Sequence, residues 1–344
     1  MSIDLEQKAS FPNTRYMGSK QAILKDIWSA VEDLQFDSVL DAFSGSGCVA
    51  HMFKQQGKQV IANDFMKYSY TIAKATIENS HITLLPSDVE FLLSPNPDSG
   101  SFVRDTFRGL YFEDAENEFI DNTLANIRRL GNEYKASLAR SALARACLKK
   151  RPRGVFTYVG SRYDDGRKDL RLSLDGHFRE SVMLLNDAVF DNGRRNSSTN
   201  LDVFSAAEDT DLVYLDPPYY TPHSDNDYVR RYHFLEGICC DWQGVTILDS
   251  TKTKKLKKYP TPFGSKRTIY RAFELLFEKF SNSIILLSYS SNGIPTREDL
   301  LGMLKTTKAS VRVIEIDHRY SFGTYGHKIG NRKNTVQEYL FVAQ

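Results

Sequence analysis

The chain has 344 residues, enough for one large α/β domain with a second domain inserted or appended, and its apolar (41%) and charged (26%) fractions are those of ordinary soluble proteins. No run of about 18 apolar residues occurs and the first ten residues are polar, so the sequence predicts neither a membrane span nor a signal peptide. The four cysteines lack a C-x-x-C spacing, which argues against a zinc site and a disulfide framework, and the net charge of +2 does not by itself indicate a nucleic-acid partner.

The first part of the sequence alternates between predicted strands and helices. Apolar residues at helical spacing predict a helix over residues 20–34, and strands are predicted over 38–42 and 59–63. A helical segment follows each strand, over 48–56 and 68–78. This alternation is typical of an open α/β domain with a parallel sheet.

The first strand runs into a glycine-rich turn that contains Gly45 and Gly47. Glycine lets a backbone approach a ligand closely and adopt positive φ without a clash at Cβ. The turn differs from the dinucleotide-binding fingerprint, because Ala50 stands where the third glycine would be. Asp64 directly follows the second strand, where an acid either binds the two hydroxyls of a ribose or caps the backbone. The sequence leaves both roles of Asp64 open.

The alternation of strands and helices stops near residue 87. A cluster of serine, proline and glycine over residues 94–100 predicts a boundary at this point. Two helices are then predicted over 113–130 and 133–149, followed by a short hairpin around 156–174. The middle of the chain is therefore expected to be a mainly helical insertion.

The sheet pattern resumes towards the carboxyl end, where a helix is also predicted over residues 228–240 with Tyr232 and His233 packed in the core. The predicted strands cover residues 198–204, 212–215, 284–288, 311–316 and 338–343. We therefore divide the chain into a first half of the α/β domain (11–95), an insertion (96–196) and a second half (197–344).

A rigid polar turn, Asp216-Pro217-Pro218-Tyr219, follows the buried strand that ends at Leu215. Neither proline has an N–H group, so the chain cannot continue the sheet and backbone carbonyls stay unpaired at the carboxyl end of the strand. Ligands of open α/β sheets bind at that end. An acid, free carbonyls and an aromatic ring can together hold a planar group that carries an amino function. A strand-terminating turn with a packing tyrosine is the alternative, and this motif alone does not decide between them.

Three segments in this order resemble the adenine-specific DNA methyltransferases that use S-adenosylmethionine, in the group that contains the Dam-type enzymes. The segments are Tyr16-Met17-Gly18-Ser19-Lys20, Asp41-Ala42-Phe43-Ser44-Gly45-Ser46-Gly47 and Asp216-Pro217-Pro218-Tyr219. The resemblance covers the chain from about residue 11 to its carboxyl end. It implies a Rossmann-like class I methyltransferase domain: residues 11–95 form its cofactor-binding half, 96–196 an inserted, mainly helical target-recognition domain, and 197–344 its catalytic half.

The resemblance implies direct methylation of an exocyclic amine. The amino nitrogen of adenine is a poor nucleophile, because its lone pair is delocalised into the ring. Hydrogen bonds from its two hydrogens to the carboxylate of Asp216 and the carbonyl of Pro217 would favour a pyramidal nitrogen that attacks the sulfonium methyl group. Pro218 would stiffen the turn, and Tyr219 would stack on a base flipped out of the duplex.

The expected cofactor is S-adenosyl-L-methionine, and no metal is expected. The amino-terminal motif would close over this cofactor, the glycine-rich turn would surround it and Asp64 would hold its ribose. The residues expected to contact it are Tyr16, Lys20, Asp41, Phe43, Ser44, Gly45, Gly47, Asp64 and, as a weaker candidate, Asp202.

Two basic segments predict contact with the phosphates of DNA. Residues 251–273 contain eight lysines and arginines and no acid, and residues 145–171 contain nine against three aspartates. A solvated basic loop explains any single residue equally well, so the prediction depends on the two clusters together. The residues expected to contact DNA are Lys150, Arg151, Arg153, Tyr158, Arg162, Lys255 and Lys258.

The sequence therefore predicts a site-specific DNA adenine N6-methyltransferase acting on double-stranded DNA in the cytoplasm of a prokaryote or in a phage-infected cell. We expect the modification enzyme of a restriction-modification system, with a cognate restriction endonuclease as a candidate partner. A cytosine N4-methyltransferase, which more often has serine in place of Asp216, and a non-catalytic DNA-binding protein of the same fold remain alternatives. Cytosine ring-carbon methylation is disfavoured, because none of the cysteines follows a proline. The recognition sequence and the oligomeric state are not predicted.

Overall fold

The computed structural model describes residues 10–160, 166–221, 227–321 and 335–344. Their strands form one seven-stranded sheet in the order β3-β2-β1-β4-β5-β7-β6. The strands are β1 (Ser38–Asp41), β2 (Gln59–Asn63), β3 (Ser197–Thr199), β4 (Leu212–Leu215), β5 (Ile284–Ser290), β6 (Val311–Ser321) and β7 (Thr335–Ala343). The first five positions of the sheet pair in parallel, whereas β7 runs antiparallel to both β5 and β6. This arrangement confirms the expected Rossmann-like α/β fold.

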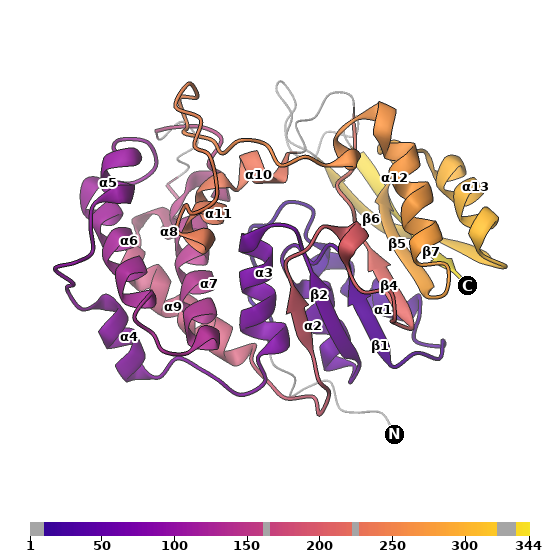
Figure 1. The fold of residues 1–344 in the computed structure, drawn as a ribbon, viewed down its shortest axis with the longest axis horizontal. Helices are drawn as coiled ribbons and strands as arrows, with labels where there is room; N and C mark the ends of the chain where they lie inside the picture. The colour runs from indigo at the N-terminus through magenta and orange to yellow at the C-terminus, as the bar shows by residue number, and fades with distance from the viewer. Residues whose placement is uncertain (1–9, 161–165, 222–226, 322–334) are drawn as a thin grey trace.

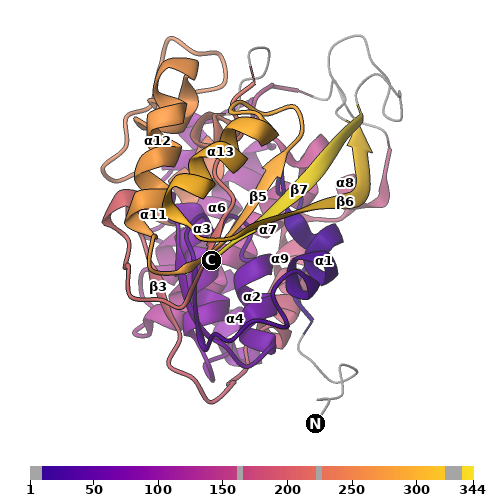
Figure 2. The same ribbon diagram turned by 90° about the vertical axis from the view of Figure 1, so that its right-hand side faces the viewer.

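Helices cover both faces of the sheet (Figures 1 and 2). On one face, Ile27 of α1 (Leu24–Ser29) and Phe53 of α2 (Cys48–Gln55) pack against alternate residues of β1, β4 and β5. On the other face, α12 (Lys266–Lys279) and α13 (Arg297–Thr307) pack against the intervening residues of the same strands. The residues of β4 are all buried, as expected of a parallel strand covered on both sides.

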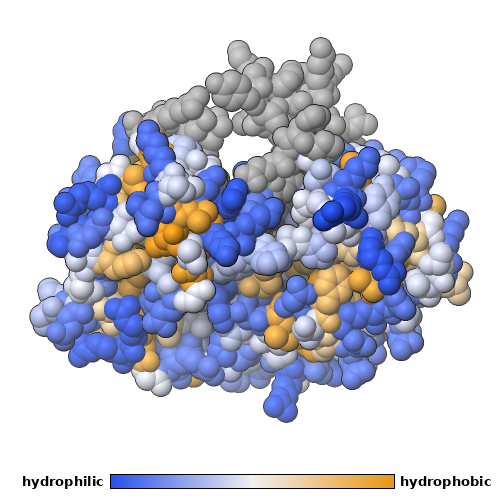
Figure 3. Space-filling view, turned by 45° about the horizontal axis from the view of Figure 1, so that its top comes forward, coloured by the Kyte–Doolittle hydropathy of each residue, from blue (hydrophilic) through white to orange (hydrophobic). Residues whose placement is uncertain are grey.

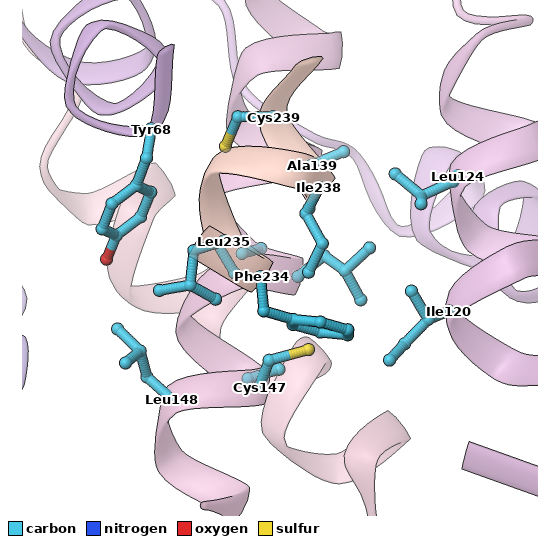
Figure 4. Close-up of a cluster of buried hydrophobic side chains, with 14 of the residues drawn as sticks. Tyr68, Ile120, Leu124, Ala139, Cys147, Leu148, Phe234, Leu235, Ile238 and Cys239 are labelled. Carbon is cyan, nitrogen blue, oxygen red and sulfur yellow. The ribbon is translucent and has the colours of Figure 1, made fainter. Parts of the chain in front are cut away.

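A third hydrophobic cluster joins the helices at the other end of the molecule (Figure 1). These helices are α3 (Lys67–Ala73), α4 (Pro86–Leu93), α5 (Phe102–Thr106), α6 (Asp114–Ile127), α7 (Glu133–Lys150), α9 (Leu174–Asp187), α10 (Tyr228–Arg231) and α11 (His233–Cys240). The short helix α8 (Lys168–Arg171) lies against α7 and has no buried residue. Phe234 and Ile238 of α11 lie at the centre of the cluster, between Tyr68 of α3 and Ile120 of α6 (Figure 4). Helix α11 therefore packs with the helical part, although in the sequence it follows the polar turn of residues 216–219.

Most elements lie where the sequence predicts them, and β2 and β4 match their predicted ranges at both ends. The predicted helix over 20–34 is a 3₁₀ turn, η2 (Lys20–Ile23), followed by α1, and the one over 68–78 is α3 followed by a π-helical turn, η3 (Lys74–Glu78). None of the helices in the described part of the chain has the length and apolar character needed to cross a bilayer.

Three local predictions are wrong. The described parts of the predicted hairpin, residues 156–160 and 166–174, contain no strand; the second part contains the helix α8, and the helix α9 that follows was not predicted. The strand predicted over 198–204 ends at Thr199, because Asp202 begins the 3₁₀ turn η5 (Val203–Ser205) by accepting a hydrogen bond from the backbone N–H of Phe204. The helix predicted over 228–240 is divided at Tyr232 into α10 (Tyr228–Arg231) and α11.

Candidate active site

The glycine-rich turn between β1 and α2 is shaped by two positive φ angles. Gly45 has φ +50° and Gly47, the N-cap of α2, has φ +83°. A Cβ on Gly45 would lie 3.2 Å from the ring of Tyr16, so glycine is needed for close approach as well as for the backbone angle. The N–H of Gly45 donates to Oδ2 of Asp64 at 2.9 Å, which ties the turn to the end of β2.

A pocket opens where the glycine-rich turn, the amino-terminal segment and the end of β4 meet. The predicted cofactor residues that line this first pocket are Tyr16, Lys20, Asp41, Phe43, Ser44, Gly45 and Asp64. Gly47 does not line it, since its Cα faces Phe11 and Ile72, and its role here is to begin α2. Asp202 is exposed and borders a smaller neighbouring pocket. The geometry therefore brings together seven of the nine predicted residues.

The first pocket contains buried polar atoms that the surrounding protein leaves unsatisfied. Among the described residues, the hydroxyl of Ser44 has no hydrogen-bond partner, and the carboxylate of Asp41 has only the backbone N–H groups of Phe43 and Ala50 near it, at positions that do not meet the geometry of a full hydrogen bond. Burial raises the pKa of Asp41 well above its usual range, and these two N–H groups oppose that rise. Asp64 accepts from the N–H groups of Gly45 and Met66, and burial raises its pKa to about 6. Unsatisfied buried polar groups are rare in proteins, so these atoms fit a polar ligand in the pocket.

Lys20 lies on the pocket wall but is paired with Asp216 of the proline turn. Its Nζ lies 2.8 Å and 2.7 Å from the two carboxylate oxygens of Asp216 and 3.0 Å from the carbonyl of Gly18. The side chain is 7% exposed, so Lys20 is not a surface lysine. Burial raises the pKa of Asp216, and the ammonium group of Lys20 opposes that rise. Lys20 thus keeps a buried acid available in its ionised form.

The proline turn separates the first pocket from a second one. Asp216 lines the first pocket, Tyr219 the second, and Pro218 both. Pro217 is buried, and no hydrogen bond within the described ranges uses its carbonyl oxygen. The phenol of Tyr219 contacts Oδ1 of Asp216 at 2.9 Å and Oε1 of Glu338 at 2.6 Å, so the ring is held at its polar end.

The second pocket has aromatic walls and a charged rim. Phe65 and Tyr228 line both pockets, and Tyr220, Tyr259 and Phe263 line only the second. Phe65 and Tyr259 meet edge to face with ring centroids 5.9 Å apart. Such a site suits a flat aromatic ligand.

Several residues of the site were not predicted from the sequence. Tyr228, Phe65 and Tyr259 lie on loops or at a helix start, where a lone aromatic carries no pattern. Glu338 is the exception: it shares one face of β7 with Leu340 and Val342, and a charged residue in such an apolar series is a signal that the sequence does contain. In the residues that the structure covers, no three His, Cys, Asp or Glu side chains are arranged to hold a metal ion.

Three of the predicted DNA contacts are held by other groups of the protein. Arg151 is a correction: it is 3% exposed, and its guanidinium donates to the carbonyls of Tyr111 and Tyr158 and stacks on their rings, so it stabilises the fold and does not face DNA. Lys150 is paired with Glu116 and with backbone carbonyls. The hydroxyl of Tyr158 donates to the carbonyl of Pro152.

The remaining predicted DNA contacts are only partly described. Lys258 is exposed and lines the second pocket, and Lys255 is half-buried nearby. Arg162 and the side chain of Arg153 lie outside the described residues. Tyr232 and His233 are fully buried and hydrogen-bonded, which confirms their core-packing role.

Comparison with known proteins gives a consistent set of relatives. The family profile for D12 class N6 adenine-specific DNA methyltransferases matches residues 16–296. The type II methyltransferase M2.HphI of Haemophilus parahaemolyticus is 33% identical over 329 residues, which cover 90% of this chain and 92% of that protein. The modification methylase StsI of Streptococcus sanguinis and the type II methyltransferase M.FokI of Planomicrobium okeanokoites are each 26% identical, and the alignments cover 96% of this chain but 52% of each of those proteins.

Proposed function

The chain belongs to the D12 class of N6 adenine-specific DNA methyltransferases, and from this premise we propose that the first pocket holds S-adenosylmethionine and the second the target adenine. The two pockets share Phe65, Pro218 and Tyr228. A donor and an acceptor bound on either side of Pro218 would therefore be neighbours, which is what direct methyl transfer requires.

The polar atoms of the first pocket support the cofactor assignment. Asp41 and Ser44 offer buried oxygens to the amino or hydroxyl groups of the cofactor, and Asp64 offers a carboxylate to its ribose. Tyr16, stacked on Tyr232 with ring centroids 5.0 Å apart, provides a rigid aromatic wall. When bound, S-adenosylmethionine supplies a methyl group activated by the positive charge on its sulfur.

The catalytic turn supports the assignment of the target base. The carboxylate of Asp216 and the carbonyl of Pro217 can each accept a hydrogen bond from the amino group of adenine, which leaves the nitrogen lone pair free to attack. Lys20 stabilises the ionised form of Asp216 that this requires. The base must leave the duplex to reach the second pocket, where Phe65, Tyr219 and Tyr259 can pack around it.

We assign DNA recognition to the helical part of the molecule, including residues 96–196, with double-stranded DNA as the partner. The face around α10, which comes forward in Figure 3, is largely hydrophilic with separate apolar areas, as suits contact with a phosphate backbone. By analogy with M2.HphI, StsI and M.FokI, we propose that the enzyme protects the sites of a restriction-modification system. Its partner in the cell would then be an endonuclease that cuts the same site.

The position of Asp216 in the first pocket, two residues before Pro218, which lines both pockets, carries the proposal. We expect Asp216→Ala to abolish methyl transfer while calorimetry still measures cofactor binding, and Asp209→Ala, which changes an exposed acid ahead of the same strand, to behave like the unchanged protein. The assay is transfer of labelled methyl groups to mixed-sequence duplex DNA, followed by identification of the labelled base. Normal turnover by Asp216→Ala would refute the catalytic assignment, and label on cytosine N4 would refute the target base.

A further inference from the structure

Glu338 is a buried acid in a strand that is otherwise built for the core. In β7, Glu338 lies on the same face as Leu340 and Val342, which belong to the hydrophobic cluster beneath α1 and α2. Glu338 is only 2% exposed. A carboxylate is expensive to bury, so a glutamate at this position needs a compensating role.

The contacts of Glu338 lead to the catalytic turn. Its Oε1 accepts from the hydroxyl of Ser288 on β5 at 2.7 Å and lies 2.6 Å from the phenol oxygen of Tyr219. That phenol oxygen lies 2.9 Å from Oδ1 of Asp216. Tyr219 therefore links the partly buried carboxyl group of Asp216 to the buried one of Glu338, and Nζ of Lys20 lies 2.7 Å from Asp216 but 3.8 Å from Glu338.

The hydroxyl of Tyr219 limits how many protons the two carboxyl groups can share. A tyrosine hydroxyl has one hydrogen, so it donates to only one of the two carboxylates at a time. Both of its short contacts are hydrogen bonds only when one carboxyl group carries a proton. Two carboxyl groups that share a site in this way also disfavour full ionisation, because their charges repel. Asp216, Tyr219 and Glu338 therefore form both hydrogen bonds only after one of the two carboxyl groups has accepted a proton.

We propose that Glu338 is a positioning residue that, through Tyr219, lets Asp216 accept the proton released by the methylated amine. The proposal rests on the function proposed above. During transfer the bond from the amine nitrogen to the methyl carbon forms, and the carbon–sulfur bond breaks with its electron pair left on sulfur. The nitrogen is then cationic and gives one proton to Oδ1 of Asp216. Asp216 passes a proton to the phenol oxygen of Tyr219 as Tyr219 gives its own proton to Oε1 of Glu338, so the number of protons is conserved.

The charged groups around Asp216 and Glu338 determine how the rate of methyl transfer should depend on pH. The other described groups that interact with this pair are Lys20 from η2, Asp41 from β1, Tyr214 from β4 and Tyr228 from α10. Burial raises the pKa of Asp216, Lys20 opposes this, and the charge of Glu338 adds to the rise. Removing the charge of Glu338 should lower the pKa of Asp216, whereas the remaining groups stay the same in both proteins.

The first test compares Glu338→Gln with the unchanged enzyme in the dependence of kcat on pH. The amide keeps an oxygen that accepts from Tyr219 and Ser288 but does not take up the proton. We expect kcat to fall roughly 100-fold near neutral pH, the acid limb of its profile to move to lower pH, and KM for the cofactor to stay within about twofold. Glu315→Gln on the neighbouring strand β6, where the acid is exposed, is the matched control and should change neither quantity. An unmoved acid limb with full activity would overturn the proposal.

The second test asks whether Glu338 acts through Tyr219. If it does, Tyr219→Phe combined with Glu338→Gln should lose no more activity than the more damaging single change, while independent losses that multiply would overturn the relay. Infrared spectra of the free protein give a readout without turnover: the band of a buried carboxylic acid should appear as pH falls and should be lost or shifted in Glu338→Gln. Cofactor affinity and thermal unfolding show that the variants are folded.

The outcomes separate this inference from the proposed function. If the unchanged enzyme methylates adenine and Glu338→Gln keeps the same rate and profile, the proton relay is wrong and the proposed function stands. If the unchanged enzyme labels no adenine in any duplex, the proposed function has failed, and the relay fails with it.

Discussion

The pairing of Lys20 with Asp216 leads to a prediction about stability that does not depend on catalysis. Lys20→Met removes the cation and keeps most of the volume, which leaves the partly buried carboxylate of Asp216 without its positive partner. The two side chains are 7% and 18% exposed, so water compensates little. Breaking one partner of a buried pair costs about 3–5 kcal/mol. We expect the lower end, about 3 kcal/mol, because Asp216 keeps its contact with Tyr219.

The loss of stability should depend on pH in a defined direction. Burial already raises the pKa of Asp216 in the folded state, and without Lys20 the pKa should rise further. A carboxyl group with a raised pKa binds more protons in the folded than in the unfolded chain, so the free energy of unfolding falls as pH rises through that interval. The difference between Lys20→Met and the unchanged protein should therefore be largest at alkaline pH and should narrow as acid neutralises Asp216.

Urea unfolding at two pH values measures this effect, with Lys25→Met as the control because Lys25 is exposed one turn further along. Asp216→Asn removes the buried charge, so the double variant Lys20→Met, Asp216→Asn should be nearly as stable as Asp216→Asn alone. An equal loss of stability at both pH values, or no relief from Asp216→Asn, would refute the electrostatic argument and leave lost packing as the cause.

Three further predictions follow from single sites. Gly45→Ala should weaken cofactor binding roughly tenfold in calorimetry, because the new Cβ presses on the ring of Tyr16 and such overpacking costs about 1–3 kcal/mol. Gly57→Ala, at φ +75° with no atom within 4 Å, carries only the backbone strain and should leave affinity unchanged. Burial raises the pKa of Asp64 to about 6, and hydrogen bonds from a ribose favour the ionised form, so cofactor affinity should fall below that pH and should lose this dependence in Asp64→Asn. A plot of the logarithm of the DNA-binding constant against the logarithm of the salt concentration should become less steep by about one unit in Lys258→Ala. Arg151→Ala should instead lower the melting temperature and leave that slope unchanged.

The sheet could be predicted from the sequence because its central strands are short apolar runs between polar turns. β4 is buried on both faces and β2 is mostly buried, and a continuous apolar run, residues 212–215 and 60–62 respectively, marks such strands clearly. The helix α8 has no buried residue, so its four residues carry no apolar pattern that could predict it. The helix α9 does carry such a pattern, because the buried residues Leu174, Phe178, Val182 and Leu185 recur at helical spacing after the N-cap Ser173, and the prediction overlooked it.

The candidate site shows a similar division between local and distant information. The glycine-rich turn and the proline turn act through their own backbones, so their geometry is encoded where they occur. The roles of Lys20 and Glu338 depend on Asp216, which is 196 residues from Lys20 in the sequence, and such a pairing is invisible before folding. Arg151 was misread because a count of basic residues reports charge and not direction, and its neighbours Tyr111 and Tyr158 bury the guanidinium.

The proline turn also explains how chemistry and sequence recognition can be separate properties of this enzyme. Asp216 lines one pocket and Tyr219 the other, so if the pockets hold donor and base as proposed, the relative placement of the two is set within a four-residue turn that two prolines keep stiff. The helical part reaches this turn through α10, whose Tyr228 lines both pockets, and through α11, whose Glu236 accepts from the first N–H groups of α3. Changes on the DNA-facing surface of the helices should therefore alter which sites are methylated, while the reaction at the turn stays the same. Changes at Tyr228 should affect both properties together, because that residue belongs to both parts.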